Sequence, residues 1–219
     1  MSDSVCIFGG TFDPIHIGHL RPALEVAEEL DLDQILLMPS AQPPHGKRTV
    51  ASFEHRLEMA RLAVADNPRL GVSDLEGRLG GKSYTINTIG AVKAENPGKE
   101  IYFLIGADAF FYLHTWHDPL KLFDMANFVV MARPKSPHTD VLDYLRTTLH
   151  SGFYQGQDGW VRLNGGKGVI RVPTTLLSIS STYIRKRAAA GRSLAYLVPP
   201  VVEDYITMMK LYEIKGKAA

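Results

Sequence analysis

Apolar and polar positions follow two patterns along the chain. One is the short unbroken apolar run that is typical of a buried strand. Such runs stand at residues 5–8, 34–38, 70–72, 101–105, 128–132 and 169–172, the third being the weakest. The other is an apolar residue at every third or fourth position, as in residues 20–30, which predicts an amphipathic helix. Because strands and helices alternate, we expect βαβ units and a parallel sheet with right-handed crossovers.

The ends of the predicted helices are marked by capping and breaking residues. Ser52 is placed to cap a helix that Asn67-Pro68 ends, and the serines within residues 178–181 are placed to cap another. Further helices are expected at residues 85–96, 119–123, 141–149 and 199–211. The rest of residues 136–168 is polar and glycine-bearing, and is expected to be loop. No repeat or long linker divides the chain, so a single domain over residues 1–219 is predicted.

Composition narrows the class of protein. The 45% hydrophobic and 21% charged content is ordinary for a globular chain of this size. A net charge of +1 supplies no basic field for nucleic acid, so any anion site must be local. No apolar run has membrane-spanning length, and no signal peptide is visible, so no membrane partner is expected. The single cysteine, Cys6, cannot form an intramolecular disulfide, which fits a cytoplasmic protein.

One stretch carries most of the candidate chemistry. After the first apolar run, Gly9 and Gly10 form a turn that can take positive φ and let a ligand approach the backbone. His16 and His19 follow where the first helix begins, and the unpaired N–H groups of a helix start favour phosphate. Zinc needs three or four protein ligands, and no third histidine or cysteine stands nearby. We therefore expect a phosphate site and no metal held by protein ligands.

Residues 9–19, with the sequence GGTFDPIHIGH, resemble the signature of the nucleotidylyltransferase superfamily. The resemblance implies an α/β fold of the H-x-G-H nucleotidylyltransferase type, a Rossmann-like doubly wound parallel sheet with helices on both faces. It also implies that the two histidines contact the phosphates of a nucleoside triphosphate.

Six further segments extend the likeness over nearly the whole chain. They are Pro43-Pro44-His45, Ser83-Tyr84-Thr85, Gly106-Ala107-Asp108, Thr115-Trp116, Arg133-Pro134 and residues 179–185. Together with the glycine turn, and in this order, they resemble bacterial nicotinate-nucleotide adenylyltransferases. That family joins nicotinate mononucleotide to the adenylyl part of ATP, giving deamido-NAD and pyrophosphate. The chain departs from the family at Gly46, which separates Pro-Pro-His from Lys47 and Arg48, so which basic residue reaches a phosphate stays open.

The resemblance implies a role for individual residues. The catalytic groups are expected to be His16, His19 and Arg185, which donate to the ATP phosphates. ATP is further expected to contact Gly9, Gly10, Thr11, Phe12, Gly18, Gly106, Asp108, Ile179, Ser180 and Ser181. Nicotinate mononucleotide is expected to contact Asp13, His45, Lys47, Ser83, Tyr84, Thr85, Trp116 and Arg133. Mg²⁺ is expected to be carried on the ATP phosphates, since it seldom uses an all-protein cage.

A physical argument supports the expected pyridine end. Tyr84 and Thr85 stand at a predicted helix start, whose free N–H groups can hold a carboxylate while Trp116 stacks on the ring. A nicotinamide would instead present its own N–H to those donors, so we expect the acid to be preferred.

Alternative interpretations remain for single residues and for the whole chain. Ser180, Ser181 and Asp108 can serve simply as helix caps, and Trp116 can be a core residue. Pantetheine-phosphate adenylyltransferases share the glycine turn, the histidines and a late Ile-Ser-Ser, but are shorter. A module that binds adenine nucleotides without turnover is a third interpretation. The oligomeric state cannot be read from the sequence, and a homo-oligomer is possible.

Overall fold

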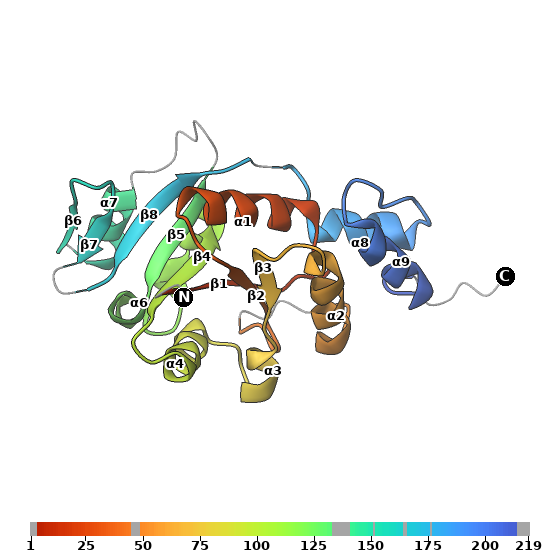
Figure 1. The fold of residues 1–219 in the computed structure, drawn as a ribbon, viewed down its shortest axis with the longest axis horizontal. Helices are drawn as coiled ribbons and strands as arrows, with labels where there is room; N and C mark the ends of the chain where they lie inside the picture. Colours follow the sequence, from red (N-terminus) through yellow and green to blue (C-terminus); the bar gives the residue numbers. More distant parts are fainter. Residues whose placement is uncertain are drawn as a thin grey trace.

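The computed structural model describes residues 4–44, 49–132, 141–150, 152–163, 166–175 and 177–213. Within these segments the strands form one eight-stranded sheet in the order β3-β2-β1-β4-β5-β8-β7-β6 (Figure 1). Neighbours from β3 to β8 run parallel, and β7 and β6 extend the sheet antiparallel. The strands are β1 Ser4–Gly10, β2 Ile35–Pro39, β3 Leu70–Val72, β4 Glu100–Gly106, β5 Asn127–Ala132, β6 Phe153–Gln155, β7 Val161–Leu163 and β8 Gly168–Pro173.

The strand order reverses direction next to β1. The chain builds β1, β2 and β3 outward to one edge, then returns to place β4 on the other side of β1, followed by β5 and β8. The carboxyl ends of β1 and β4 therefore lie side by side, with Phe8 paired to Leu104. Open α/β sheets bind ligands at such a reversal, because the loops leaving the two strands diverge and leave a crevice between them.

Helices cover both faces of the sheet, as predicted. In the described segments they are α1 Ile17–Glu29, α2 Phe53–Val64, α3 Leu75–Leu79, α4 Thr85–Glu95, α5 Ala107–Phe110, η1 Leu113–Thr115, α6 Pro119–Met125, α7 Val141–Tyr144, η2 Leu145–Leu149, α8 Ser181–Ala189 and α9 Pro200–Met208. Figure 1 shows α1 on one side of the sheet and α4 on the other. No helix in the described part of the chain is long and apolar enough to cross a membrane.

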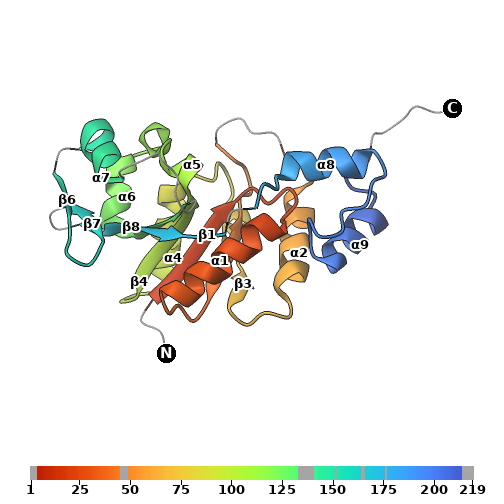
Figure 2. The same cartoon turned by 90° about the horizontal axis from the view of Figure 1, so that it is seen from above.

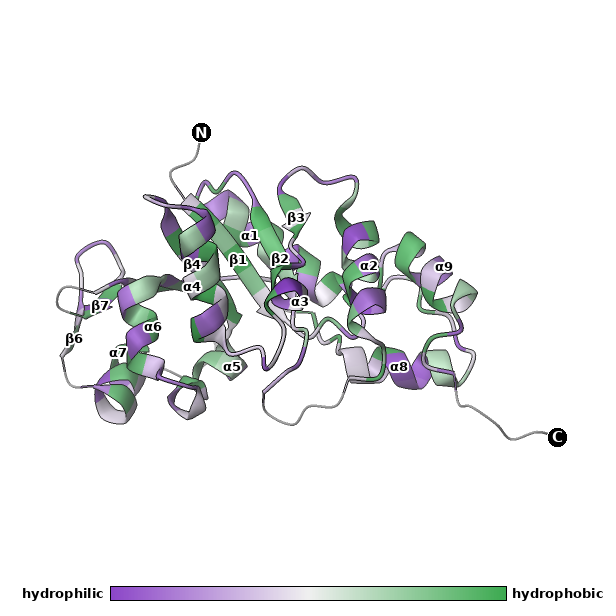
Figure 3. Ribbon diagram, turned by 90° about the horizontal axis from the view of Figure 1, so that it is seen from below, coloured by the Kyte–Doolittle hydropathy of each residue, from purple (hydrophilic) through white to green (hydrophobic). Residues whose placement is uncertain are grey.

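Two hydrophobic cores result, one on each face. Alternate residues of β1 divide between them, with Cys6 and Phe8 packing under α1 and Ile7 packing on the α4 side. Strands that are covered on both faces must be apolar throughout, which is why they were visible in the sequence as unbroken runs. The hydropathy colouring agrees, since the central strands are predominantly hydrophobic (Figure 3).

The capping signals are confirmed by direct hydrogen bonds. The Ser52 hydroxyl accepts from the backbone N–H of His55 at 3.4 Å at the start of α2. The Ser180 hydroxyl accepts from the N–H of Tyr183 at 3.2 Å at the start of α8. Both helices therefore begin where the sequence predicted. In each, the cap hydroxyl satisfies one of the first-turn N–H groups that have no partner within the helix.

The region after residue 149 departs from the prediction. Residues 141–149 are helical as expected, ending in the π-helical turn η2, but β6 and β7 form a hairpin where loop was predicted. Each strand is three residues long and buries one side chain, Phe153 or Val161. So short a pattern carries no periodic signal. The last helix, predicted to Leu211, ends at Met208.

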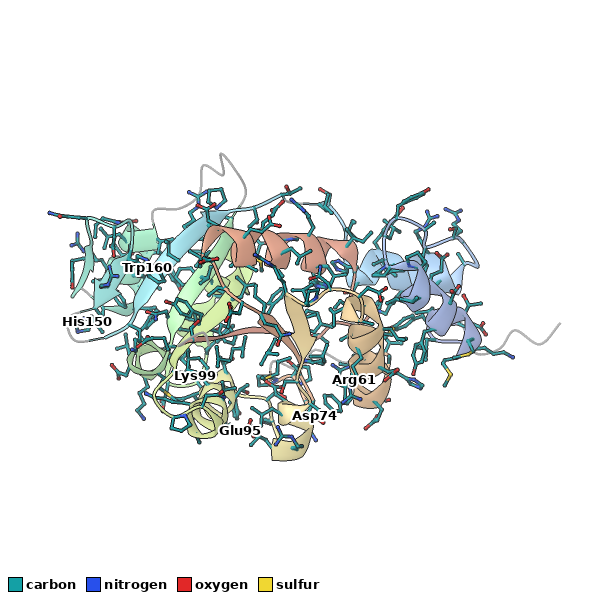
Figure 4. All side chains as sticks on the ribbon, in the orientation of Figure 1. Arg61, Asp74, Glu95, Lys99, His150 and Trp160 are labelled. Carbon is teal, nitrogen blue, oxygen red and sulfur yellow. The ribbon has the colours of Figure 1, made fainter. Side chains whose placement is uncertain are left out.

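Exposed ion pairs connect α2, α3 and α4. Arg61 of α2 lies 3.7 Å from the carboxylate of Asp74, and Arg78 of α3 bonds both Asp74 and Glu95 of α4. Figure 4 shows Arg61, Asp74 and Glu95 close to one another on neighbouring segments. All four side chains are more than 40% exposed, so each pair contributes at most about 1 kcal/mol to stability.

Candidate active site

A cavity of about 470 Å³ opens where the strand order reverses, at the carboxyl ends of β1 and β4. It brings together residues that are far apart in the sequence, from Phe8 to Thr174. The candidate residues on its wall are Gly9, Gly10, Thr11, Phe12, Gly18, His19, Ser83, Tyr84, Thr85, Gly106, Asp108 and Trp116. Candidates on separate segments thus meet in one site of the size that takes a small ligand.

The glycine turn after β1 is shaped by the ring of Phe12. A Cβ at Gly10 would lie 2.7 Å from this ring, and one at Gly9 would lie 3.2 Å from the ring of Phe103. Phe12 itself is 2% exposed and has a φ of +48°, an uncommon conformation for a residue with a side chain. The close approach of Phe12 therefore requires glycine at position 10 and keeps the backbone open toward the cavity.

His16 and His19 form a stacked pair at the start of α1. Their ring centroids are 3.6 Å apart, and the backbone N–H of His16 donates to Nδ1 of His19 at 3.3 Å. Because Nδ1 of His19 accepts this bond, neutral His19 carries its proton on Nε2, where it can be donated to a ligand. Gly18 makes the stack possible, since a Cβ there would lie 3.0 Å from the His16 ring.

His16 lies behind the cavity wall. Its side chain is 4% exposed, and burial lowers its pKa to about 4. Nδ1 of His16 has no hydrogen-bond partner in the described part of the chain. His16 is therefore neutral at physiological pH and supports the ring of His19, which itself lines the cavity.

The depressed pKa of His16 predicts a stability loss in mild acid. The unfolded chain takes up a proton near the ordinary pKa of 6.5, whereas the folded protein resists it until about pH 4. The contribution of His16 to stability is thus present above pH 6.5 and is lost as the pH falls toward 4, by about 2 kcal/mol between pH 7 and pH 5. Urea unfolding at both pH values should show this loss in the wild type and a smaller one in His16→Asn, which does not titrate. An identical pH dependence in the two proteins would contradict the assignment.

A fully buried arginine, Arg56 of α2, forms hydrogen bonds with three loops, one of which lines the cavity through Thr11. It donates to the backbone carbonyls of Thr11 at 2.7 Å, Ala51 at 3.3 Å and Ala41 at 3.4 Å. Burial lowers the pKa of Arg56, but the guanidinium remains charged at neutral pH. Sequence reasoning missed Arg56 because an arginine in an amphipathic helix is usually solvated. Its position on the same helical face as Met59 and Ala60 was the available signal.

Glu76 is a second residue that the sequence did not reveal. Its carboxylate accepts from the backbone N–H of Ala41 at 3.2 Å and from the hydroxyl of Thr88 at 2.8 Å. Glu76 is 7% exposed and lines the cavity. Together, Arg56 and Glu76 hold Ala41 from both its carbonyl and its N–H, which fixes the loop after β2.

The start of α8 docks against the loop that follows β1. The hydroxyl of Ser181 donates to the carbonyl of Pro14 at 2.9 Å, and Nη1 of Arg185 donates to the carbonyl of Asp13 at 2.6 Å. Ile179 approaches the glycine motif, lying 3.5 Å from a Cβ built on Gly18. Ile179, Ser180, Ser181 and Arg185 stand beside the cavity wall and not on it. The capping role of Ser180 is confirmed, while a ligand role for these residues stays a prediction.

Asp13 has internal partners. Its side chain is 3% exposed and accepts from the N–H groups of Val50 and Ala51, at 2.7 Å and 3.2 Å. It does not line the cavity. The carboxylate of Asp13 instead holds the loop before α2. The predicted contact between Asp13 and the pyridine nucleotide therefore finds no support in this arrangement.

The other end of the cavity is built by α4 and Trp116. Ser83 is tied to Gln42 through both its N–H and its hydroxyl, at 2.9 Å and 3.0 Å, which brings the loop after β2 against the start of α4. Tyr84 is the first flanking residue of α4 and makes no side-chain cap. Trp116 packs edge-to-face on Phe103 with ring centroids 6.3 Å apart. It also lines the cavity, so it serves the core and the site together.

Four other candidates have the following positions. Asp108 is exposed on the cavity wall, in the first turn of α5. The N-cap of α5 is Gly106, so the alternative that Asp108 caps this helix is wrong. His45 and Lys47 lie outside the described residues, as does Arg133.

Comparisons with known proteins show the family of this chain. The family model for cytidylyltransferase-like proteins matches residues 7–187. A protein of Syntrophotalea carbinolica named probable nicotinate-nucleotide adenylyltransferase is 45% identical over 97% of this chain and 98% of its own length. A protein of Trichlorobacter lovleyi with the same name is 41% identical over 94% of this chain and 98% of its own length.

A solved structure shares the fold. The nicotinic acid mononucleotide adenylyltransferase of Plasmodium falciparum, complexed with NaAD, superposes with a TM-score of 0.71 at 21% identity and covers 95% of this chain and 97% of that one. The sequence likeness to the bacterial proteins runs along nearly the whole of both chains. The chain therefore belongs to the nicotinate-nucleotide adenylyltransferases, within the cytidylyltransferase-like family.

Proposed function

We propose that this protein transfers the adenylyl group of ATP to nicotinate mononucleotide, giving deamido-NAD and pyrophosphate. The observation that carries the proposal is a single cavity with two chemically different ends. One end holds the glycine turn and His19 at the start of α1. The other holds the uncapped start of α4 beside Trp116. A dinucleotide product needs a site for polyphosphate next to a site for an anionic aromatic ring.

The reaction is an in-line displacement at phosphorus. An oxygen of the nicotinate mononucleotide phosphate attacks the α-phosphorus of ATP, the bond to the bridging oxygen breaks, and pyrophosphate leaves with that electron pair. The attacking phosphate is already ionised, so no general base is needed. Catalysis then comes from holding the two phosphates in line and from donors aimed at oxygens that gain charge. His19 supplies such a donor through Nε2–H, and neutral His16 keeps its ring in place.

The positions of several candidate residues support the proposed ATP end. The backbone of residues 9–12, together with Gly18 and His19, faces the triphosphate. Arg185, Ser180, Ser181 and Ile179 approach from the start of α8. Asp108, exposed in the first turn of α5 after β4, accepts from ribose hydroxyls beside Gly106. We propose no ligand contact for Asp13, whose carboxylate is engaged inside the protein.

Mg²⁺ bound to ATP fits this donor set. In the described residues no group of three or more histidine, cysteine, aspartate or glutamate side chains could hold a metal ion. The wall near His19 offers N–H donors, which suit phosphate oxygens. A magnesium ion carried on the phosphates would neutralise charge on the leaving pyrophosphate. We further propose a cytoplasmic location, which fits a lone buried thiol, Cys6.

One assay tests the proposed reaction. The protein is incubated with ATP, Mg²⁺ and either nicotinate mononucleotide, nicotinamide mononucleotide or phosphopantetheine, and pyrophosphate and the dinucleotide are measured. We expect product with nicotinate mononucleotide, clearly less with the amide, and none with phosphopantetheine. Turnover of phosphopantetheine instead would support the alternative adenylyltransferase. Nucleotide binding without pyrophosphate release would support a binding module.

Trp116→Ala should raise KM for nicotinate mononucleotide about tenfold and leave KM for ATP within twofold, because it removes the proposed stacking surface for the pyridine ring. Initial rates with each substrate varied in turn provide the measurement. Trp160→Ala is the matched control, since Trp160 packs on Tyr102 away from the cavity (Figure 4). Equal changes in both KM values would show that Trp116 serves the fold alone.

A further inference from the structure

The carboxylate of Asp13 joins three segments that are remote in sequence. Oδ2 accepts from the N–H of Val50 at 2.7 Å. Oδ1 accepts from the N–H of Ala51 at 3.2 Å and from the hydroxyl of Tyr212 at 2.8 Å. Both oxygens of this buried anion are therefore engaged by donors from the loop before α2 and from the segment after α9.

Tyr212 is held in place for this contact. It is 9% exposed and has a φ of +67°, a conformation that is unfavourable for a residue with a side chain and persists only when tertiary contacts impose it. Burial and the charge of Asp13 both raise the pKa of Tyr212, so its hydroxyl stays protonated and acts as the donor. A hydrogen bond thus joins residues 199 positions apart.

Arg185 lies next to the same carboxylate without a direct hydrogen bond to it. Nη1 donates to the backbone carbonyl of Asp13 at 2.6 Å but is 3.9 Å from Oδ2. Nη2 donates to the hydroxyl of Thr182 at 3.2 Å. Arg185 has five N–H groups, and in the described chain protein oxygens accept hydrogen bonds from two of them.

A carboxylate that already accepts from several donors competes less for a neighbouring guanidinium. Suppose that Oδ1 of Asp13 lost the hydroxyl of Tyr212. The guanidinium of Arg185 could then replace this donor, because its Nη1 already lies 3.9 Å from Oδ2. Arginine and carboxylate form short bidentate pairs when both are available. Such a pair would draw the guanidinium of Arg185, whose side chain is 23% exposed, toward the buried carboxylate of Asp13.

We propose that Tyr212 is a positioning residue for nucleotide binding. Its hydroxyl holds the carboxylate of Asp13, so that Arg185 is oriented by the Asp13 carbonyl and its remaining N–H groups are free to bind the polyphosphate of ATP. This role rests on the proposed function, in which Arg185 contacts phosphate. The two C-terminal helices contribute to this arrangement, since α8 carries Arg185 and the chain that leaves α9 carries Tyr212. These helices lie together at one end of the molecule (Figure 1 and Figure 2).

Tyr212→Phe is the central test, because it removes one hydroxyl and keeps the ring. We expect KM for ATP, and Kd for a non-hydrolysable ATP analogue measured by calorimetry, to rise about tenfold. KM for nicotinate mononucleotide should stay within twofold. Tyr205→Phe is the matched control: it removes a hydroxyl from α9 whose partner is Nδ1 of His55, at 2.9 Å, and should change neither KM.

A double-mutant cycle tests whether Tyr212 acts through Arg185. In an Arg185→Lys background, Tyr212→Phe should have little further effect on Kd for the analogue, since lysine cannot form the same fork. Three results would overturn the inference: an unchanged Kd in Tyr212→Phe, an equal rise in KM for both substrates, or full additivity with Arg185→Lys. Failure of the proposed function is separate, because a wild type without adenylyl transfer can still show the Tyr212-dependent Kd.

Discussion

His19→Ala is expected to lower kcat by about 10²–10³ and to change KM for ATP much less. His19 lines the cavity at the start of α1, and its Nδ1 is occupied by the N–H of His16, which leaves Nε2–H as the donor. A donor aimed at charge that develops during the reaction stabilises the transition state more than bound substrate, and losing one costs about this factor. Pyrophosphate release under saturating substrates gives kcat directly.

The control for this substitution is an exposed histidine that does not line the cavity. His150 accepts from the N–H of Gly152 near the β6–β7 hairpin, away from the cavity (Figure 4). His150→Ala should therefore keep wild-type kcat. Thermal unfolding of His19→Ala should remain cooperative, which separates lost catalysis from lost folding. Turnover of His19→Ala near the wild-type value would remove His19 from the mechanism.

Arg56→Met should lower the free energy of unfolding by about 3 kcal/mol or more. The substitution keeps a long apolar stem but removes every donor, so the carbonyls of Thr11 and Ala41 lose a charged partner inside the protein. Each lost bond to a charged group costs about 1.5–3 kcal/mol. Urea unfolding at pH 7 measures the change. Activity should fall with it, because the same bonds hold the loops that form the cavity mouth.

Arg61→Ala tests whether burial is the cause. Arg61 lies on the same helix, α2, and is 52% exposed, with ion-pair distances of 4.0 Å and 3.7 Å. Its removal should change the free energy of unfolding by no more than about 0.5 kcal/mol. Equal losses for the two arginines would mean that burial of Arg56 and its bonds to the loops do not cause the effect.

Local patterns in the sequence predicted the features that depend on near neighbours. The strands β1, β2, β4, β5 and β8 were visible because a sheet covered on both faces needs unbroken apolar runs. Ser52 and Ser180 were recognised as caps because a cap bonds a backbone group three residues away. The glycine turn and the two histidines were recognised by their spacing, and the family resemblance named the remaining candidates.

Contacts between distant segments were decided by the tertiary structure. Arg56 appears in the sequence as an ordinary helix charge, and only the meeting of three loops around it makes it a buried clamp. The β6–β7 hairpin was missed because its short strands depend on pairing with β8. The partners of Asp13 were equally hidden, since Tyr212 comes from the other end of the chain.

The sequence by itself therefore determined the alternation of strands and helices, the glycine turn with its two histidines and, through the family resemblance, the class of protein. The tertiary structure decided the strand order, the cavity between β1 and β4 and the internal role of Asp13. The physical reason is that periodicity and capping report interactions within one turn or one strand. Burial and hydrogen bonding across about 200 residues exist only once the sheet has closed its cores.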